Sequence, residues 1–84
     1  MGADASSLVR ESVEFHRHVL EKELELCEAK LLSLEKSHGM STEEFEAKFG
    51  RGELGDDRQW FDWLEETEAA RHLRAKVESL RKLA

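Results

Sequence analysis

The sequence predicts an all-α protein in which two long antiparallel helices, over about residues 8–38 and 57–83, are joined by a short helix over about 42–49 and a Gly-rich turn. The chain has 84 residues and no proline, and most of its glycines lie in one central stretch. On both sides of that stretch apolar residues recur at spacings of three and four, the period of an amphipathic helix. A chain of this length forms one domain at most, so residues 1–84 are predicted to form a single helical domain.

The first long helix is predicted over residues 8–38, because nothing in this range breaks a helix. Residues 1–7 are small and polar and are predicted to be disordered, with Ser6 or Ser7 as the N-cap of the helix. Gly39 follows the range directly, and glycine commonly ends a helix.

This helix is predicted to carry more apolar surface than one partner helix can cover. Its heptad-like seam consists of Val13, Arg17, Leu20, Leu24, Cys27, Leu31 and Leu34. A second set of apolar residues, predicted to lie beside the seam and to widen it, consists of Leu8, Phe15, Val19 and Leu26.

The short helix over residues 42–49 has the best-specified start in the sequence. Ser41 and Glu44 have the spacing of a capping box, and Met40 with Phe45 has that of a hydrophobic staple. Phe45 and Phe49 are four residues apart and therefore share one face of the helix. The helix is predicted to stop at the Gly-rich segment 50–55, which forms a sharp, irregular turn.

The third helix is predicted over residues 57–83, with Asp56 or Asp57 as a capping carboxylate. Trp60, Phe61 and Leu64 enlarge the apolar surface at its start. The tryptophans allow two interpretations: a small core where three helices meet, or the energetic centre of an interface. The seam of this helix consists of Trp63, Glu66, Ala70, Leu73, Val77, Leu80 and Ala84.

A domain this small is marginally stable without additional support. The single cysteine, Cys27, excludes an intramolecular disulfide, and no Cys/His group has zinc-site spacing. Oligomerisation or a partner protein is therefore the expected support. The surplus apolar surface suits either a homodimeric four-helix bundle or a hairpin bound to a different protein, and the Gly-rich turn also permits exchange of the third helix between two chains.

No residue pattern predicts catalysis, a cofactor or a metal site. His18 and Glu21, with His16 nearby, are better explained as exposed helix residues than as metal ligands. Glu35 and His38 have the Glu-x-x-His spacing of di-iron bundles, but such a site needs two of these elements and two further glutamates. Cys27 has no histidine within one helical turn, so a core thiol is expected rather than a nucleophile. The chain is therefore predicted not to be an enzyme.

The charge balance favours a basic protein partner. The formal net charge is −6, which disfavours direct nucleic-acid binding because that depends on neutralising phosphates with Lys and Arg. An acidic surface attracts a basic partner by electrostatic steering. The sequence contains no run of about 20 apolar residues and no secretory signal pattern at its start, so a cytoplasmic location is expected.

Two sequence elements lie between the long helices. The first reads Gly-Met-Ser-Thr-Glu-Glu-Phe over residues 39–45, and the second reads Gly-Glu-Leu-Gly-Asp-Asp over 52–57, followed by Trp60. The segment 38–63, about a third of the chain, resembles a family of short all-helical prokaryotic antitoxins that pair with small ribonuclease-like toxins. The resemblance implies a helical hairpin without catalysis that neutralises a cognate toxin by direct binding.

The predicted partner-binding set combines the motif positions with exposed apolar positions on the long helices. The resemblance points first to Phe45, Phe49, Leu54, Trp60 and Trp63. The surplus apolar surface adds Phe61, Phe15 and Val19. The alternative prediction is a self-associating coiled-coil adaptor or structural protein, which would cover the same surface with a second copy of the chain.

Overall fold

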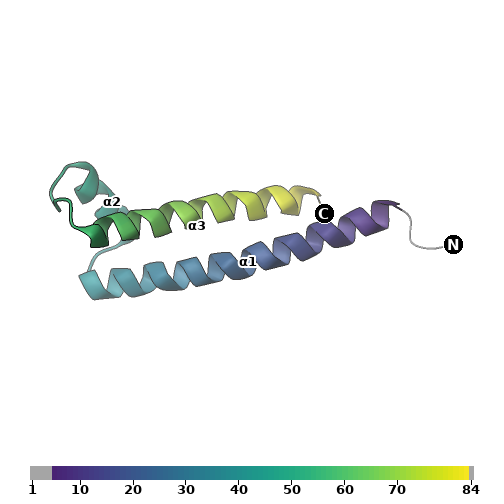
Figure 1. Ribbon diagram of the computed structural model, residues 1–84, viewed down its shortest axis with the longest axis horizontal. Coiled ribbons are helices and arrows are strands. Elements are labelled where there is room, and N and C mark those ends of the chain that lie inside the picture. Colours follow the sequence, from purple (N-terminus) through teal and green to yellow (C-terminus); the bar gives the residue numbers. More distant parts are fainter. Residues whose placement is uncertain (1–4, 84) are drawn as a thin grey trace.

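Three helices make up the fold. The computed structural model describes residues 5–83 of the chain. Helix α1 comprises Ala5–His38, helix α2 comprises Thr42–Gly50, and helix α3 comprises Arg58–Leu83. This part of the chain contains no strand (Figure 1). The predicted all-α architecture, with a short helix between two long ones, is confirmed.

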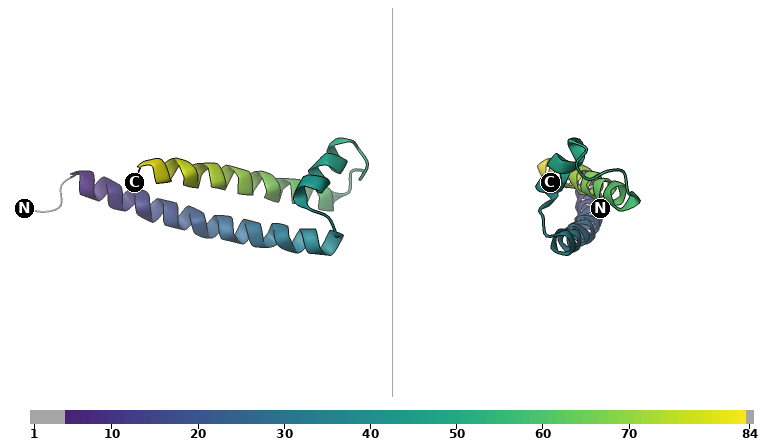
Figure 2. Two further views of the ribbon diagram at one scale, coloured as in Figure 1. Left: turned by 180° about the vertical axis from the view of Figure 1, so that it is seen from behind. Right: turned by 90° about the vertical axis from the view of Figure 1, so that its left-hand side faces the viewer.

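The two long helices pack against each other and run antiparallel, and α2 lies at the end where they are joined (Figure 1). We call this the closed end of the hairpin. At the other, open end, α1 continues beyond the last turn of α3 (Figure 1). The molecule is an elongated rod of 63 × 20 × 18 Å. The view along the rod shows α2 lying to one side of the two long helices, close to α3 (Figure 2).

The N-terminal boundary of α1 differs from the prediction. The helix begins at Ala5, so the predicted disorder is wrong for residues 5–7, and Ser6 and Ser7 lie within the helix instead of capping it. Alanine is the best helix former and serine is tolerated inside a helix, so nothing in this short stretch prevents the extra turn. Residues 1–4, which complete the predicted disordered segment, lie outside the described residues. The other boundaries differ from the prediction by one residue or less.

The predicted seams form the interface between α1 and α3. Their members within the described residues are all buried or half-buried, and Ala84 lies outside them. One buried residue of α3, Thr67, was not predicted from the sequence because threonine is polar. Its hydroxyl donates to the Trp63 carbonyl at 2.9 Å, which satisfies the buried hydroxyl. The apolar core consists of Leu20, Phe45, Trp63, Ala70 and Val77.

The end of α1 and the starts of α2 and α3 have the expected capping chemistry. Gly39 ends α1 with a φ of 65°, a conformation that favours glycine. The Ser41 hydroxyl accepts a hydrogen bond from the Glu44 N–H at 3.1 Å and so caps α2. At α3, Asp57 is the capping residue and not Asp56, because the Asp57 carboxylate accepts from the Gln59 N–H at 3.3 Å.

Exposed ion pairs connect α3 to both other helices. Arg74 on α3 bonds Glu28 on α1 at 3.1 Å, and Arg71 on α3 bonds Glu46 on α2 at 3.2 Å. Exposed pairs of this kind contribute about 0–1 kcal/mol each, so they orient the helices more than they stabilise them. Among the described residues, no helix is both long enough and apolar enough to cross a membrane.

Candidate partner-binding surfaces

An aromatic core supports the closed end. The rings of Phe45 on α2 and Trp63 on α3 stack in parallel, with centroids 4.2 Å apart and planes inclined by 2°. Both side chains are fully buried. The Trp63 indole N–H donates to the Thr42 hydroxyl at 3.3 Å, so its one polar atom is satisfied inside the core. Stacking and the hydrogen bond together fix α2 on α3.

Two residues of the Glu-x-x-His element have structural roles in this core. The His38 ring packs against Trp60 and Trp63, with centroid distances of 4.9 and 5.2 Å. The Glu35 carboxylate accepts the Thr42 N–H at 2.7 Å and thereby adds a second cap to α2. Within the described residues, no group of three or more His, Cys, Asp or Glu side chains is arranged to hold a metal ion.

The structure divides the predicted partner-binding set into three groups. Phe45 and Trp63 belong to the core, so neither side chain is accessible to a partner in the folded chain. Phe49, Leu54 and Trp60 are half-buried around that core, and Phe61 beside them is 46% exposed. Phe15 and Val19 lie on α1, well away from the closed end, with 72% and 39% of their surface exposed.

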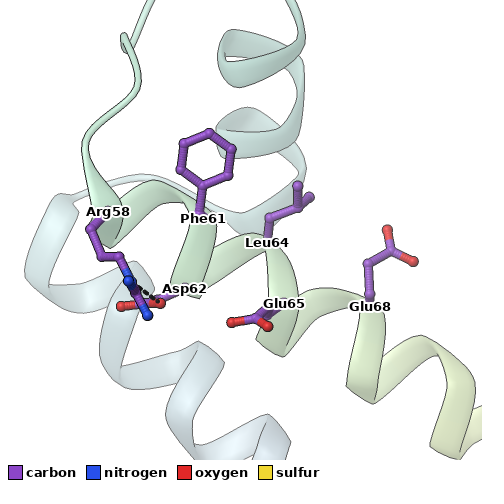
Figure 3. Close-up of a pocket in the computed structure, with 6 residues that line it drawn as sticks. All are labelled: Arg58, Phe61, Asp62, Leu64, Glu65 and Glu68. Carbon is purple, nitrogen blue, oxygen red and sulfur yellow. Dashed lines mark ion pairs between the residues drawn. The ribbon is translucent and has the colours of Figure 1, made fainter.

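Helix α3 carries a shallow hollow near the closed end (Figure 3). The Phe61 ring projects from α3 toward α2 and meets Phe49 edge-on, with centroids 5.3 Å apart. The half-buried Leu64 continues the apolar surface one turn further along α3. We call this feature the closed-end hollow, and its lining residues are Arg58, Phe61, Asp62, Leu64, Glu65 and Glu68.

The closed-end hollow carries an excess of negative charge. Its single cation, Arg58, lies 3.5 Å from Asp62, and both side chains are mostly exposed. Glu68 is paired with Arg71 at 2.8 Å. Glu65 has no ion pair among the residues described. An exposed aromatic ring bordered by carboxylates suits a ligand with an apolar group and an adjacent basic group.

The outer strip of α1, which we define as Leu8, Phe15, Val19 and Leu26, is the second accessible apolar surface. These four side chains are between 39% and 72% exposed. At 3.6 residues per turn, the strip lies about 130° around α1 from the seam with α3. The prediction that these residues lie beside the seam and widen it is therefore wrong, because they form a separate face that α3 does not cover. The rotation of about 100° per residue along a helix is enough to predict this separation from the sequence.

Cys27 is half-buried on the α1 seam and is not paired in a disulfide. Burial, followed by a hydrogen bond with the Glu66 carboxylate, raises the pKa of the Cys27 thiol. A raised pKa keeps the thiol protonated and weakens it as a nucleophile. The position therefore suits packing better than chemistry.

No family model, curated protein or solved structure matches the chain. The resemblance of residues 38–63 to the antitoxins stays a prediction. The two accessible surfaces, the closed-end hollow and the outer strip, are the features from which a function can be proposed.

Proposed function

We propose that this chain is a non-catalytic protein-binding module that covers a basic partner protein with its closed-end hollow, as an antitoxin neutralises its cognate toxin. The observation that supports this most directly is the Phe61 ring, 46% exposed on a rigid helix and bordered by carboxylates. Large exposed aromatic rings are frequent energetic centres of interfaces when neighbouring groups exclude water around them.

The support beneath Phe61 suits a binding surface. Phe49 holds the Phe61 ring edge-on, and Phe49 in turn packs on Phe45, whose centroid is 5.6 Å away. A ring fixed before binding loses little conformational entropy when a partner arrives. Asp62, Glu65 and the other acids of the hollow add long-range attraction for a basic protein.

The resemblance to antitoxins supplies the class of partner. Much of the shared motif serves the fold here, because Ser41 caps α2, Phe45 lies in the core and Asp57 caps α3. The side chain that this arrangement presents to solvent is Phe61, next to the motif residue Trp60. A small basic ribonuclease-like toxin is the partner that both the resemblance and the charge favour.

The test is co-expression with the product of the adjacent gene, followed by size-exclusion chromatography with light scattering. We expect a stable complex, and we expect Phe61→Ser to weaken it by about 30-fold, as for a hot spot of about 2 kcal/mol. Leu32→Ser is the matched control, since Leu32 is 52% exposed on α1 outside both surfaces. Absence of a complex, or equal effects of the two substitutions, would contradict the proposal.

Self-association is a second candidate function, as in a coiled-coil adaptor or structural protein. The observation that favours it is the outer strip, which leaves four large apolar side chains on one face of α1 without a partner helix. A protein of this kind would form a homodimer that does not respond to the neighbouring gene product.

A further inference from the structure

We propose that two copies of the chain associate through the outer strip of α1 in a parallel, in-register, two-stranded coiled coil. This inference gives the second candidate function its geometry. It is independent of the closed-end hollow, which lies on α3 beside α2.

The outer strip belongs to a complete heptad pattern. The four strip residues, together with Ser12, Lys22 and Ala29, follow one another at alternating spacings of four and three. This is the spacing of the core positions of a coiled coil. Five of these seven positions are apolar. The positions in order are Leu8, Ser12, Phe15, Val19, Lys22, Leu26 and Ala29.

A second helix can reach this face without displacing α3. Leu8, Phe15 and Leu26 are 56%, 72% and 65% exposed, so they offer most of their surface to a second copy. The strip lies about 130° around α1 from the seam, which keeps α3 of each copy clear of the α1 helix of the other. The α1 helices would therefore be central in the dimer, with the α3 helices outside.

Charge complementarity at the borders of the strip selects the parallel orientation. In a parallel coiled coil, the residue directly before the first core position of each heptad faces the residue five places later in the other copy. Here those first core positions are 12, 19 and 26. Each of these contacts joins a carboxylate to a histidine or lysine, and no like-charged pair occurs. The three contacts are Glu11 with His16, His18 with Glu23, and Glu25 with Lys30 of the other copy.

The antiparallel alternative has the opposite electrostatics. Placing Phe15 of one copy against Val19 of the other aligns the carboxylates of Glu11 and Glu25, which carry like charges. Like charges across a helix interface are destabilising and suppress the wrong pairing. The core would be satisfied in either orientation, so the flanking charges decide.

Existing contacts within one chain leave the flanking charges available. Lys30 lies 3.9 Å from Glu66, and Glu25 lies 3.6 Å from Lys22. The side chains of Lys22, Glu25 and Lys30 are 64%, 67% and 68% exposed, and pairs made by such exposed groups are weak, so these three can be shared with a second copy. Lys22, the one charged core position, already directs its ammonium group toward Glu25 at the border of the strip. A lysine in the core sets the register of a coiled coil at a cost in stability.

The first test measures the mass of the full chain by light scattering and its dissociation constant by sedimentation. We expect twice the chain mass of 9.7 kDa. Leu26→Ser should weaken the dimer by about tenfold or more, whereas Leu32→Ser should leave it unchanged. The two leucines are similarly exposed, at 65% and 52%, but lie on different faces of α1. Lys22→Leu should tighten the dimer.

The second test determines orientation with one introduced thiol. In a Cys27→Ser background, Ser12→Cys should form a disulfide-linked dimer under mild oxidation, because position 12 faces itself only in the parallel register. In the antiparallel register it faces position 22, so only the double variant Ser12→Cys/Lys22→Cys would cross-link.

Three results would overturn the inference: a monomer at concentrations well above micromolar, equal effects of Leu26→Ser and Leu32→Ser, or cross-linking of the double variant alone. Phe61→Ser should leave the dimer intact. Failure of self-association is therefore distinguishable from failure to bind a basic partner.

Discussion

The indole N–H of Trp63 has its hydrogen-bond partner on a different helix. It donates to the Thr42 hydroxyl at the first residue of α2, and both side chains are buried. A buried donor that loses its acceptor costs about 1–3 kcal/mol. Thr42 therefore matters more to stability than its size suggests.

Replacement of Thr42 by valine tests this contact at nearly constant shape. We expect Thr42→Val to lower the free energy of unfolding by about 1–3 kcal/mol, measured by urea titration of tryptophan fluorescence. Thr67→Val is the control, because the Thr67 hydroxyl donates to the Trp63 carbonyl and leaves no unpaired donor when removed. Its cost should stay below about 1 kcal/mol. Equal costs would contradict the assigned role of Thr42.

The Cys27 thiol should react slowly in the folded chain. Burial and the Glu66 carboxylate raise its pKa, so at any given pH the folded protein contains less thiolate than the unfolded protein. The reaction rate with a disulfide reagent increases as the thiolate forms. The pH at which this increase occurs should therefore be higher in buffer than in concentrated urea. An exposed thiol made on α3 by Ser79→Cys in the Cys27→Ser background should show no such difference between buffer and urea. Coinciding pH profiles for folded and unfolded Cys27 would refute the prediction.

At the scale of the element, α2 depends on caps from two directions. It has only 9 residues, and isolated helices of this length are unstable in water. The Ser41 hydroxyl bonds the Glu44 N–H from within the chain's local sequence, while the Glu35 carboxylate reaches the Thr42 N–H from α1. The second cap ties the start of α2 to the end of α1.

Removal of the local cap should be measurable. We expect Ser41→Ala to lower the free energy of unfolding by about 1 kcal/mol. Ser37→Ala lies on exposed helix surface and should be neutral or stabilising by up to about 0.5 kcal/mol, because alanine is the better helix former. Thermal unfolding followed by circular dichroism distinguishes the two. Indistinguishable variants would mean that the Glu35 carboxylate alone is sufficient to hold α2.

The sequence predicted the structural features that depend on residues close together in the chain. The Ser41 cap and the stop at Gly39 depend only on near neighbours, and the helical repeat found both seams. It could not find the Glu35 contact to Thr42, which exists only once α1 and α2 meet in space. It also could not decide between core and interface for Phe45 and Trp63, because spacing shows which residues share a face but not what covers that face.

At the scale of the whole molecule, the rod shape leaves little of the chain in a protected interior. The axes measure 63 × 20 × 18 Å, and five apolar residues are buried among those described. Domains of this size are marginal on their own. Association through the outer strip would therefore contribute a large share of the total stability.

That coupling predicts a melting temperature that depends on concentration. If the folded form is a dimer, a tenfold rise in protein concentration should raise Tm by about 3–6 °C. The dependence should be reduced in Leu26→Ser, whose weaker dimer is dissociated over more of the concentration range, and retained in Leu32→Ser. A wild-type Tm that stays constant over two decades of concentration would show that unfolding and association are not linked.

The contacts of the closed end also bear on the order in which the chain is expected to fold. The bond between Trp63 and Thr42 joins residues 21 positions apart, whereas that between Arg74 and Glu28 joins residues 46 apart. Because shorter loops cost less entropy to close, we expect the aromatic core to form first and the hairpin to close toward its open end. The first turns of α1, which extend beyond α3, gain no contacts from this closure. Their backbone amides should exchange with solvent fastest in the monomer and slow only when a second chain arrives.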